Sequence, residues 1–362
     1  MTVSAAMLKS LPDTLSPKPI PMKRALPLLL CLLFLAPACN ALLSQTDGRQ
    51  RYDYTQRDPL AEVAEDNWLR PAEEFHGGRF YTAAGIGAGA YAAFGVGLYS
   101  IWYKGYELES FHTFNDWPEW EQMDKAGHLF TAYFFNRTAF AGLRWTGLKR
   151  PAARYTALGV ANLLQATIET MDGFSSNWGF SLSDMGANLA GSLVFTAQDA
   201  LWREQRILLK VSNDFRPPPD IVVEHPSGAS SNLGNISRLR FGSSVAERYL
   251  KDYNAQTIWA SINIASIVQA HTLPPWLNIA VGYGVEDVYG AYGNVWRENG
   301  VGFGYRTGDR RRQWFLSPDI YLSRIPTRKR WVRLALGILD FVKVPAPALE
   351  YSRGRFYGHW IM

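Results

Sequence analysis

The chain has 362 residues, enough for two domains of ordinary size. Hydrophobic residues make up 47% of it and aromatic residues 14%, which excludes a chain that is disordered throughout, because this much apolar surface can build a core. The net charge of +5 comes from basic residues scattered along the chain, so nucleic acid is not an expected partner.

The N-terminal region predicts an export signal. Two positive charges follow Met22, an apolar run occupies 25–35, and small residues precede Cys39. This order is typical of a secretory signal peptide, and the apolar run is too short to span a bilayer comfortably. We therefore expect residues 1–39 to be an N-terminal extension and signal. Translation starts at Met22 in this interpretation; the alternative is one long positive segment before the apolar run.

Cys39 is the candidate lipidation site. Diacylation would hold the mature N-terminus to a membrane by burying acyl chains. The alternative is cleavage after Ala38 under the Ala-x-Ala rule of an ordinary signal peptidase. The other cysteine, Cys31, lies inside the apolar run, so we expect no internal disulfide and no cysteine-based zinc site in the mature chain. Residues 40–75 are polar and are expected to form a linker.

No charged residue occurs between Arg79 and Lys104. An uncharged stretch of this length is sufficient for a transmembrane helix, and its aromatic residues near both ends suit membrane interfaces. Its many glycines and alanines would let another helix approach closely. We expect a transmembrane helix over 80–103; the alternative is a buried helix of a soluble bundle.

Three more helices are expected, over 124–145, 151–171 and 181–207. Pro151 suits the first turn of the second of these helices. Ser181 and Asp184 resemble a capping box at the start of the third. Together with 80–103, the segments predict a membrane-associated helical bundle of about four helices within a domain at 76–213.

The character of the chain changes at three consecutive prolines, residues 217–219, which exclude a regular helix. We expect a Pro-rich linker over 214–235. Over 236–362 apolar residues alternate with a period of two, which predicts a domain rich in antiparallel strands. Within it, 327–343 has helical apolar spacing among arginines and lysines. Such a basic amphipathic helix lies in a membrane interface or packs on the sheet with a solvated basic face. The predicted fold class is α+β.

The three later helices carry polar residues spaced so that they share one face of each helix. These residues are Asp124 and His128, then Gln165, Glu169 and Asp172, then Asp184 and Asn188. Charged groups on apolar helices are costly unless they meet or line a wet cavity, so we expect one shared polar pocket. It could support general acid–base catalysis or hold a divalent metal. Alternatively, Asp124 and His128 form a surface pair, Asp184 interacts with the helix dipole, and Asn188 is a buried amide. A further alternative is that all these residues form one structural network.

Three segments of the helical half resemble one bacterial family. They are Asp124-Lys125-Ala126-Gly127-His128, Glu169-x-x-Asp172-Gly173-Phe174-Ser175 and Trp178-Gly179-Phe180-Ser181-x-x-Asp184-x-x-x-Asn188-x-x-Gly191. The family is an uncharacterised group of predicted periplasmic lipoproteins similar to YfiM. The same order of acidic, basic and amide residues also resembles VanZ-like membrane proteins, although the loop at Trp178 departs from that family's pattern. The resemblance implies an envelope location and a shared polar site, and neither family implies a reaction.

Three functions agree with these patterns. The first is an uncharacterised envelope protein whose polar site binds a ligand or organises the bundle. The second is an enzyme that acts on an envelope lipid or glycan, with His128 as the general acid or base and the carboxylates tuning it or holding a metal. The third is an outer-membrane β-structure formed by the C-terminal half.

The expected location is the periplasmic side of the envelope in association with a membrane, with the outer membrane favoured. The expected partners are membrane lipid and an envelope lipid or glycan; the metal and any cofactor stay open. The candidate catalytic residues are Asp124, His128, Glu169, Asp172 and Asp184. The candidate ligand-binding residues are Lys125, Ser175 and Asn188.

Overall fold

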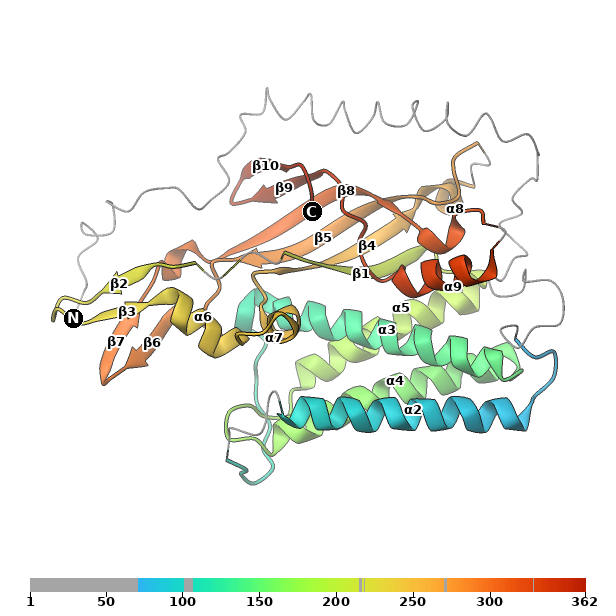
Figure 1. Cartoon of the computed structure of the whole chain (residues 1–362), viewed down its shortest axis with the longest axis horizontal. Helices are drawn as coiled ribbons and strands as arrows, with labels where there is room; N and C mark the ends of the chain where they lie inside the picture. Colours follow the sequence, from blue (N-terminus) through green and yellow to red (C-terminus); the bar gives the residue numbers. More distant parts are fainter. Residues whose placement is uncertain (1–70, 101–106, 215–216, 218, 270–271, 328) are drawn as a thin grey trace.

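The computed structural model describes residues 71–100, 107–214, 217, 219–269, 272–327 and 329–362. The predicted export signal, Cys39, most of the predicted linker at 40–75 and the last residues of 80–103 lie outside this part of the chain. In the described part, long helices lie on one side of an antiparallel sheet (Figure 1). This arrangement confirms the predicted α+β class.

The long helices are α2 (Gly77–Leu98), α3 (Met123–Trp145), α4 (Arg150–Gly173) and α5 (Leu182–Trp202). α4 has Pro151 in its first turn, where its fixed φ is favourable. α5 follows Ser181, whose hydroxyl accepts a hydrogen bond from the Asp184 amide. α3 crosses α5 at Gly191, where a Cβ atom would lie 2.0 Å from the Leu129 carbonyl oxygen. The glycine therefore allows these two helices to touch through their backbones.

α2 lies at the edge of the helical layer. None of its residues is buried, and it contacts α3 through the rings of Phe94 and Phe135, whose centroids are 6.1 Å apart. Among the residues that the structure describes, no helix has both the length and the hydropathy to cross a bilayer. The prediction of a transmembrane helix over 80–103 is corrected accordingly. The segment is helical over most of its length, but its glycines, alanines and tyrosines are too weakly apolar.

A six-stranded sheet has the order β1-β4-β5-β8-β9-β10, and all its neighbouring strands are antiparallel. The strands are β1 (Ile207–Asn213), β4 (Gln256–Asn263), β5 (Leu277–Glu286), β8 (Arg311–Ile320), β9 (Ala348–Ser352) and β10 (Arg355–His359). Met123 at the start of α3 shares a core with Val211, Ile258 and Val285 of the first three strands. The sheet thus holds the N-terminal end of α3 in place.

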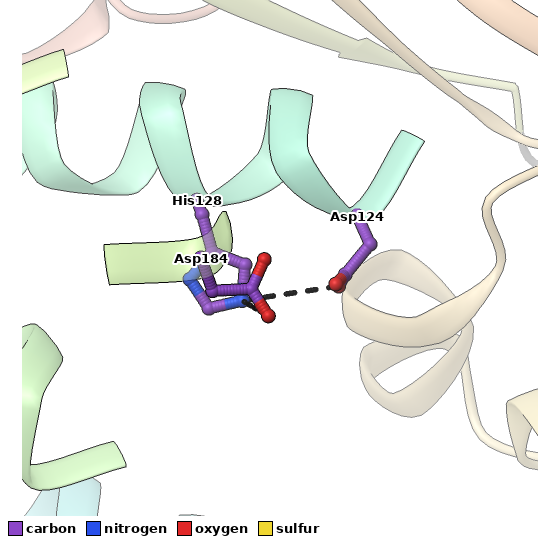
Figure 2. Close-up of side chains that lie close together, drawn as sticks. All are labelled: Asp124, His128 and Asp184. Atoms are coloured by element: carbon purple, nitrogen blue, oxygen red, sulfur yellow. Dashed lines mark ion pairs between the residues drawn. The ribbon is translucent and has the colours of Figure 1, made fainter. Parts of the chain in front are cut away.

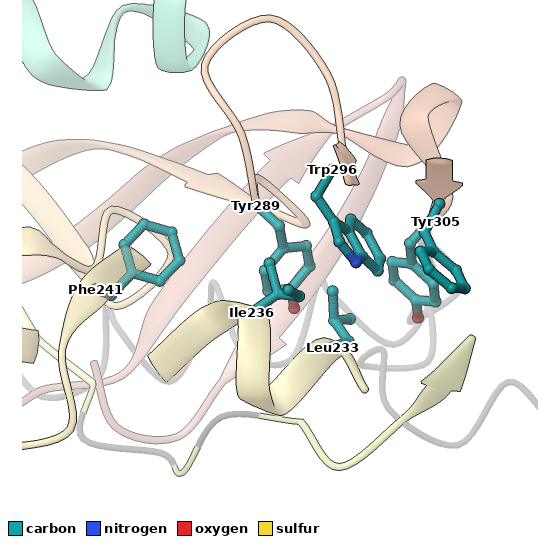
Figure 3. Close-up of a cluster of buried hydrophobic side chains, with 7 residues drawn as sticks. Leu233, Ile236, Phe241, Tyr289, Trp296 and Tyr305 are labelled. Carbon is teal, nitrogen blue, oxygen red and sulfur yellow. The ribbon is translucent and has the colours of Figure 1, made fainter. Parts of the chain in front are cut away.

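A smaller lobe extends from one end of the sheet (Figure 1). It contains β2 (Val222–Glu224), β3 (Ser230–Asn232), α6 (Leu233–Phe241), α7 (Val245–Lys251), β6 (Val295–Glu298) and β7 (Val301–Gly304). In its core, Leu233 and Ile236 of α6 lie among the rings of Tyr289, Trp296 and Tyr305 (Figure 3). The paired strands β2 and β3 fall within 214–235, the predicted linker, and the domain boundaries themselves stay a prediction.

The remaining elements are short. They are η3 (Glu119–Gln122), α8 (Ile264–Val268), η4 (Thr307–Asp309), η5 (Leu322–Arg324) and α9 (Arg330–Leu339). α9 confirms a helix within 327–343. Its residues Trp331, Leu334 and Ile338 are 67%, 50% and 56% exposed, and their spacing places them on one stripe. The alternative, in which the sheet covers the apolar face of α9, is therefore wrong for Trp331, Leu334 and Ile338.

The sheet face turned away from α3 buries charged groups. Lys210 Nζ of β1 lies 2.8 Å from Asp319 Oδ2 of β8. Lys343, after α9, donates to the carbonyl groups of Pro318 at 2.9 Å and Val344 at 2.8 Å. Burial lowers the pKa of Lys343 to about 8. Lys210 thus links the edge strand β1 to β8, and Lys343 joins the segment after α9 to β8.

Candidate functional site

The polar residues predicted to converge meet where α3 and α5 begin and α4 ends, except Asp172, which does not join them. Asp124 and His128 lie one turn apart on α3, and Asp184 lies in the first turn of α5. Their side chains point toward one another (Figure 2). We name the whole group the polar cluster, which consists of Asp116, Asp124, Lys125, His128, Gln165, Glu169, Asp184, Asn188 and Tyr253.

Lys125 is the cation at the centre of the polar cluster. Its Nζ atom lies 2.7 Å from Asp116 Oδ2, 3.0 Å from Asp124 Oδ2 and 2.7 Å from Asp184 Oδ1. The residue is only 6% exposed, and three carboxylates offset the cost of burying its ammonium. The geometry therefore makes Lys125 a counter-ion, while the ligand-binding role expected from the sequence stays a prediction.

His128 lies between two pairs of polar groups. Its Nδ1 atom is 3.1 Å from Asn188 Oδ1 and 3.6 Å from Glu169 Oε1. Its Nε2 atom is 3.8 Å from Asp124 Oδ1 and 3.7 Å from Asp184 Oδ2. Only the Asn188 distance is that of a hydrogen bond. The two carboxylate oxygens near Nε2 approach the ring without bonding to it.

The amide of Gln165 fixes which atom of Asn188 faces the imidazole. Gln165 Nε2 donates to Asn188 Oδ1 at 2.6 Å and to the His128 carbonyl oxygen at 3.4 Å. Because Asn188 Oδ1 is an acceptor, the hydrogen between it and the ring belongs to His128 Nδ1. In the neutral imidazole the lone pair then lies on Nε2, on the side of Asp124 and Asp184.

Two members of the polar cluster are not among the residues predicted from the sequence. Asp116 accepts hydrogen bonds from the hydroxyl groups of Ser181 and Ser183, both at 2.6 Å. Tyr253, from the second half of the chain, donates to Asp124 Oδ1 at 2.6 Å. Asp116 stands outside the helical periodicity, and the only signal for it is its position shortly before the first motif. The sequence around Tyr253 does not indicate that this residue contacts Asp124, because only the tertiary fold brings it to α3.

Two predicted site residues shape the turn between α4 and α5. The Ser175 amide donates to the Asp172 carbonyl at 3.0 Å, and the Ser175 hydroxyl accepts from the Asn177 amide at 3.3 Å. The structure thus places Ser175 in this turn. Asp172 lies at the end of α4, where its negative charge adds to burial in raising the pKa of Glu169. The ligand-binding role of Ser175 and the catalytic role of Asp172 stay predictions.

The carboxyl groups of the polar cluster differ in pKa because burial and nearby charges act on them differently. It raises the pKa of Glu169 to about 8. Burial and the negative charge of Asp124 raise the pKa of Asp184 to about 9. Burial also opposes ionisation of Asp124, but the charges of His128 and Lys125 outweigh it and lower the pKa of this group. Carboxyl groups of high and low pKa side by side are typical of acid–base sites.

The arrangement offers two kinds of chemistry. An imidazole oriented by an amide and flanked by acids can transfer protons to or from a ligand. Within the described residues, Asp124, His128 and Asp184 also form a group in which one ligand atom of each lies within 4.8 Å of the others. Carboxylate oxygen and imidazole nitrogen are suitable donors for a divalent cation.

Comparison with known proteins gives one family. A family model described as predicted periplasmic lipoprotein (DUF2279) matches residues 114–197. The matched segment contains every member of the polar cluster except Tyr253. The match confirms the resemblance to predicted periplasmic lipoproteins and supports a periplasmic, envelope-associated location; the resemblance to VanZ-like proteins is not shown. No curated protein and no solved structure matches the chain.

Proposed function

We propose that the protein is a membrane-associated envelope protein whose polar cluster binds the polar headgroup of an envelope lipid or glycan. The carrying observation is that buried ionisable groups from three helices meet at a place that is still partly open. The side chains of Asp124 and His128 are 20% and 17% exposed. A purely structural network needs no such opening. Acids, an imidazole and amides are the donors and acceptors that recognise hydroxyl or phosphate groups.

The outer surface of α5 supports a lipid location for this ligand. Leu182, Leu189 and Leu193 are 75%, 48% and 44% exposed, and their spacing places them on one face of the helix. Asp184 and Asn188 occupy the opposite face, inside the polar cluster. Helix α5 therefore turns its apolar side outward and its polar side inward. An exposed apolar face on a protein that matches periplasmic lipoproteins favours contact with a bilayer.

Vesicle flotation tests the membrane proposal. The full chain carries Cys39→Ser so that no acyl anchor masks weaker contacts, and we expect it to float with vesicles of phosphatidylglycerol and phosphatidylethanolamine. Leu189→Ser combined with Leu193→Ser should reduce the floated fraction several-fold. Leu239→Ser is the matched control, because Leu239 is 82% exposed on α6. Flotation of the double variant at the control level would rule out the α5 face.

Calorimetric titration tests headgroup binding at the polar cluster. The probes are glycerol 3-phosphate for a lipid and N-acetylglucosamine for a glycan. We expect one of them to bind the full chain and His128→Ala to lose that binding. His225→Ala is the control, because this histidine lies in the β2–β3 turn and bonds only within it among the described contacts. Failure of both probes to bind the unchanged protein would contradict the proposal.

Acid–base catalysis on the same headgroup is the second candidate function. It is favoured by the fixed orientation of His128, whose Nδ1 is held by Asn188 while the ring edge is partly exposed. Incubation with extracted envelope lipids and with peptidoglycan fragments, followed by mass spectrometry, would show a changed headgroup. Conversion that persists at full rate in His128→Ala would eliminate the imidazole as the acid or base.

A further inference from the structure

The charge arrangement around His128 Nε2 is incomplete. The neutral ring carries its hydrogen on Nδ1, because Asn188 Oδ1 is an acceptor there. Its Nε2 lone pair then faces Asp124 Oδ1 at 3.8 Å and Asp184 Oδ2 at 3.7 Å. Three electron-rich atoms that face a common point repel one another unless a proton or a metal cation lies between them.

Lys125 does not supply that charge at this point. Its ammonium binds Asp124 Oδ2 and Asp184 Oδ1, which are the other oxygen atoms of the same two carboxylates. Lys125 thus neutralises one side of the acid pair and orients it. The remaining oxygen of each acid is directed toward His128.

The spacing fits a small metal ion. Oxygen and nitrogen ligands bind Zn²⁺ at about 2.0–2.2 Å, so two ligands of a tetrahedral site lie roughly 3.4 Å apart. The observed separations of 3.7 and 3.8 Å from Nε2 are close to this value and too long for hydrogen bonds. The three ligand atoms lie within 4.8 Å of one another, so small side-chain movements would bring them around an ion.

The groups behind these three residues are arranged as the outer shell of a metal site. Metal-binding histidines usually donate their second N–H to a fixed acceptor, as His128 does to Asn188. Tyr253 donates to Asp124 Oδ1 and orients that acid. Glu169, which is 1% exposed, directs Oε1 toward the His128 ring, and this oxygen makes no hydrogen bond within the described residues. This buried oxygen lies beside Nδ1, so Glu169 acts on the opposite side of the ring from the point that Asp124 and Asp184 face.

We propose that Asp124, His128 and Asp184 bind one divalent transition-metal cation of the Zn²⁺ or Mn²⁺ type. The imidazole ligand argues against Ca²⁺ and Mg²⁺, which prefer oxygen ligands only. Three protein ligands leave a further coordination position, and the partly exposed sides of Asp124 and His128 give a ligand access to it. The site stands on this geometry alone and does not depend on the proposed lipid association.

The test is titration of the chelator-treated full chain with Zn²⁺ and Mn²⁺, with no lipid or headgroup present. We expect one bound ion per chain by calorimetry and elemental analysis. His128→Ala and Asp184→Asn should weaken binding about a hundredfold or more, and Asn188→Ala about ten- to a hundredfold. His225→Ala should bind as the unchanged chain does. Circular dichroism identifies any variant that fails to fold. If either His128→Ala or Asp184→Asn fails to fold, the affinity of the other variant is compared with that of the unchanged chain.

Two results would overturn the metal site. One is the absence of stoichiometric binding of either ion to the unchanged chain. The other is binding of equal strength in folded His128→Ala and Asp184→Asn, which would place the ion elsewhere. Substitution with Co²⁺ gives a separate readout, because four-coordinate nitrogen and oxygen ligation produces strong visible absorption that His128→Ala should remove. Metal binding without headgroup binding would leave this site intact and reject only the proposed headgroup.

Discussion

Replacing Gly191 with alanine tests whether the polar cluster depends on the close approach of α3 and α5. A Cβ atom at Gly191 would lie 2.0 Å from the Leu129 carbonyl oxygen and 2.8 Å from the carbonyl carbon. Backbone atoms cannot rotate away, so the helices must separate. Overpacking of this kind costs about 3 kcal/mol. Alanine returns about 1 kcal/mol through its helix propensity, so Gly191→Ala should destabilise the protein by about 2 kcal/mol.

Gly186→Ala is the matched control for this substitution. It lies on the same helix, is exposed, and has no atom within 4 Å of an added Cβ, so it should gain about 1 kcal/mol. Urea unfolding of both variants measures the difference. Gly191→Ala should also weaken Zn²⁺ binding about tenfold, because Leu129 follows His128 and the separated helices stretch the Asn188 bond. Similar stability changes in the two variants would refute the close-contact argument.

Three further predictions concern buried groups, each measured as the free energy of unfolding in urea. Asp199→Asn should cost about 3–5 kcal/mol, because Arg150 and Arg154 both donate to this buried carboxylate and would lose their counter-ion; a loss under about 1 kcal/mol would contradict this. The lowered pKa of Lys343, about 8 against 10.5 when unfolded, means that the unfolded chain binds more protons between these values. Stability should therefore rise with pH across that window, and Lys343→Met should flatten the rise; an equal slope in both proteins would refute it. Leu233→Ala should cost about 2–5 kcal/mol because this side chain is fully buried in the smaller lobe, and a change near zero would show that its core is not packed as described.

The helical half was largely predictable because its signals are local. Pro151 and Ser181 mark helix starts through their own backbone chemistry, and both helices begin beside them. The meeting of His128 with Asp184 followed from the cost of leaving charged groups in an apolar interior. The sequence pattern could not show which side chain each charged group contacts. Lys125 was expected to bind a ligand, yet three carboxylates surround it.

The second half was predictable as strands but not as a sheet. A period of two indicates a strand, but it does not say which strands pair or which face meets the helices. Lys210 interrupts an apolar run as a solvent-facing lysine would, yet it is fully buried against Asp319. The short strands β2 and β3 have too few residues for a periodic signal. The export signal and Cys39 lie outside the described residues, so these predictions stay open.

The hydroxyl group of Tyr253 makes the polar cluster a product of both halves of the chain. It is the donor to Asp124 Oδ1, but it stands beyond residues 114–197, the segment that matches the family. A fragment cut after that segment would keep the acid and lose its donor. Such a fragment would need water or a different side chain in the same place, so the pKa of Asp124 would differ between the fragment and the whole chain. The β-rich half therefore tunes the site as well as supporting it.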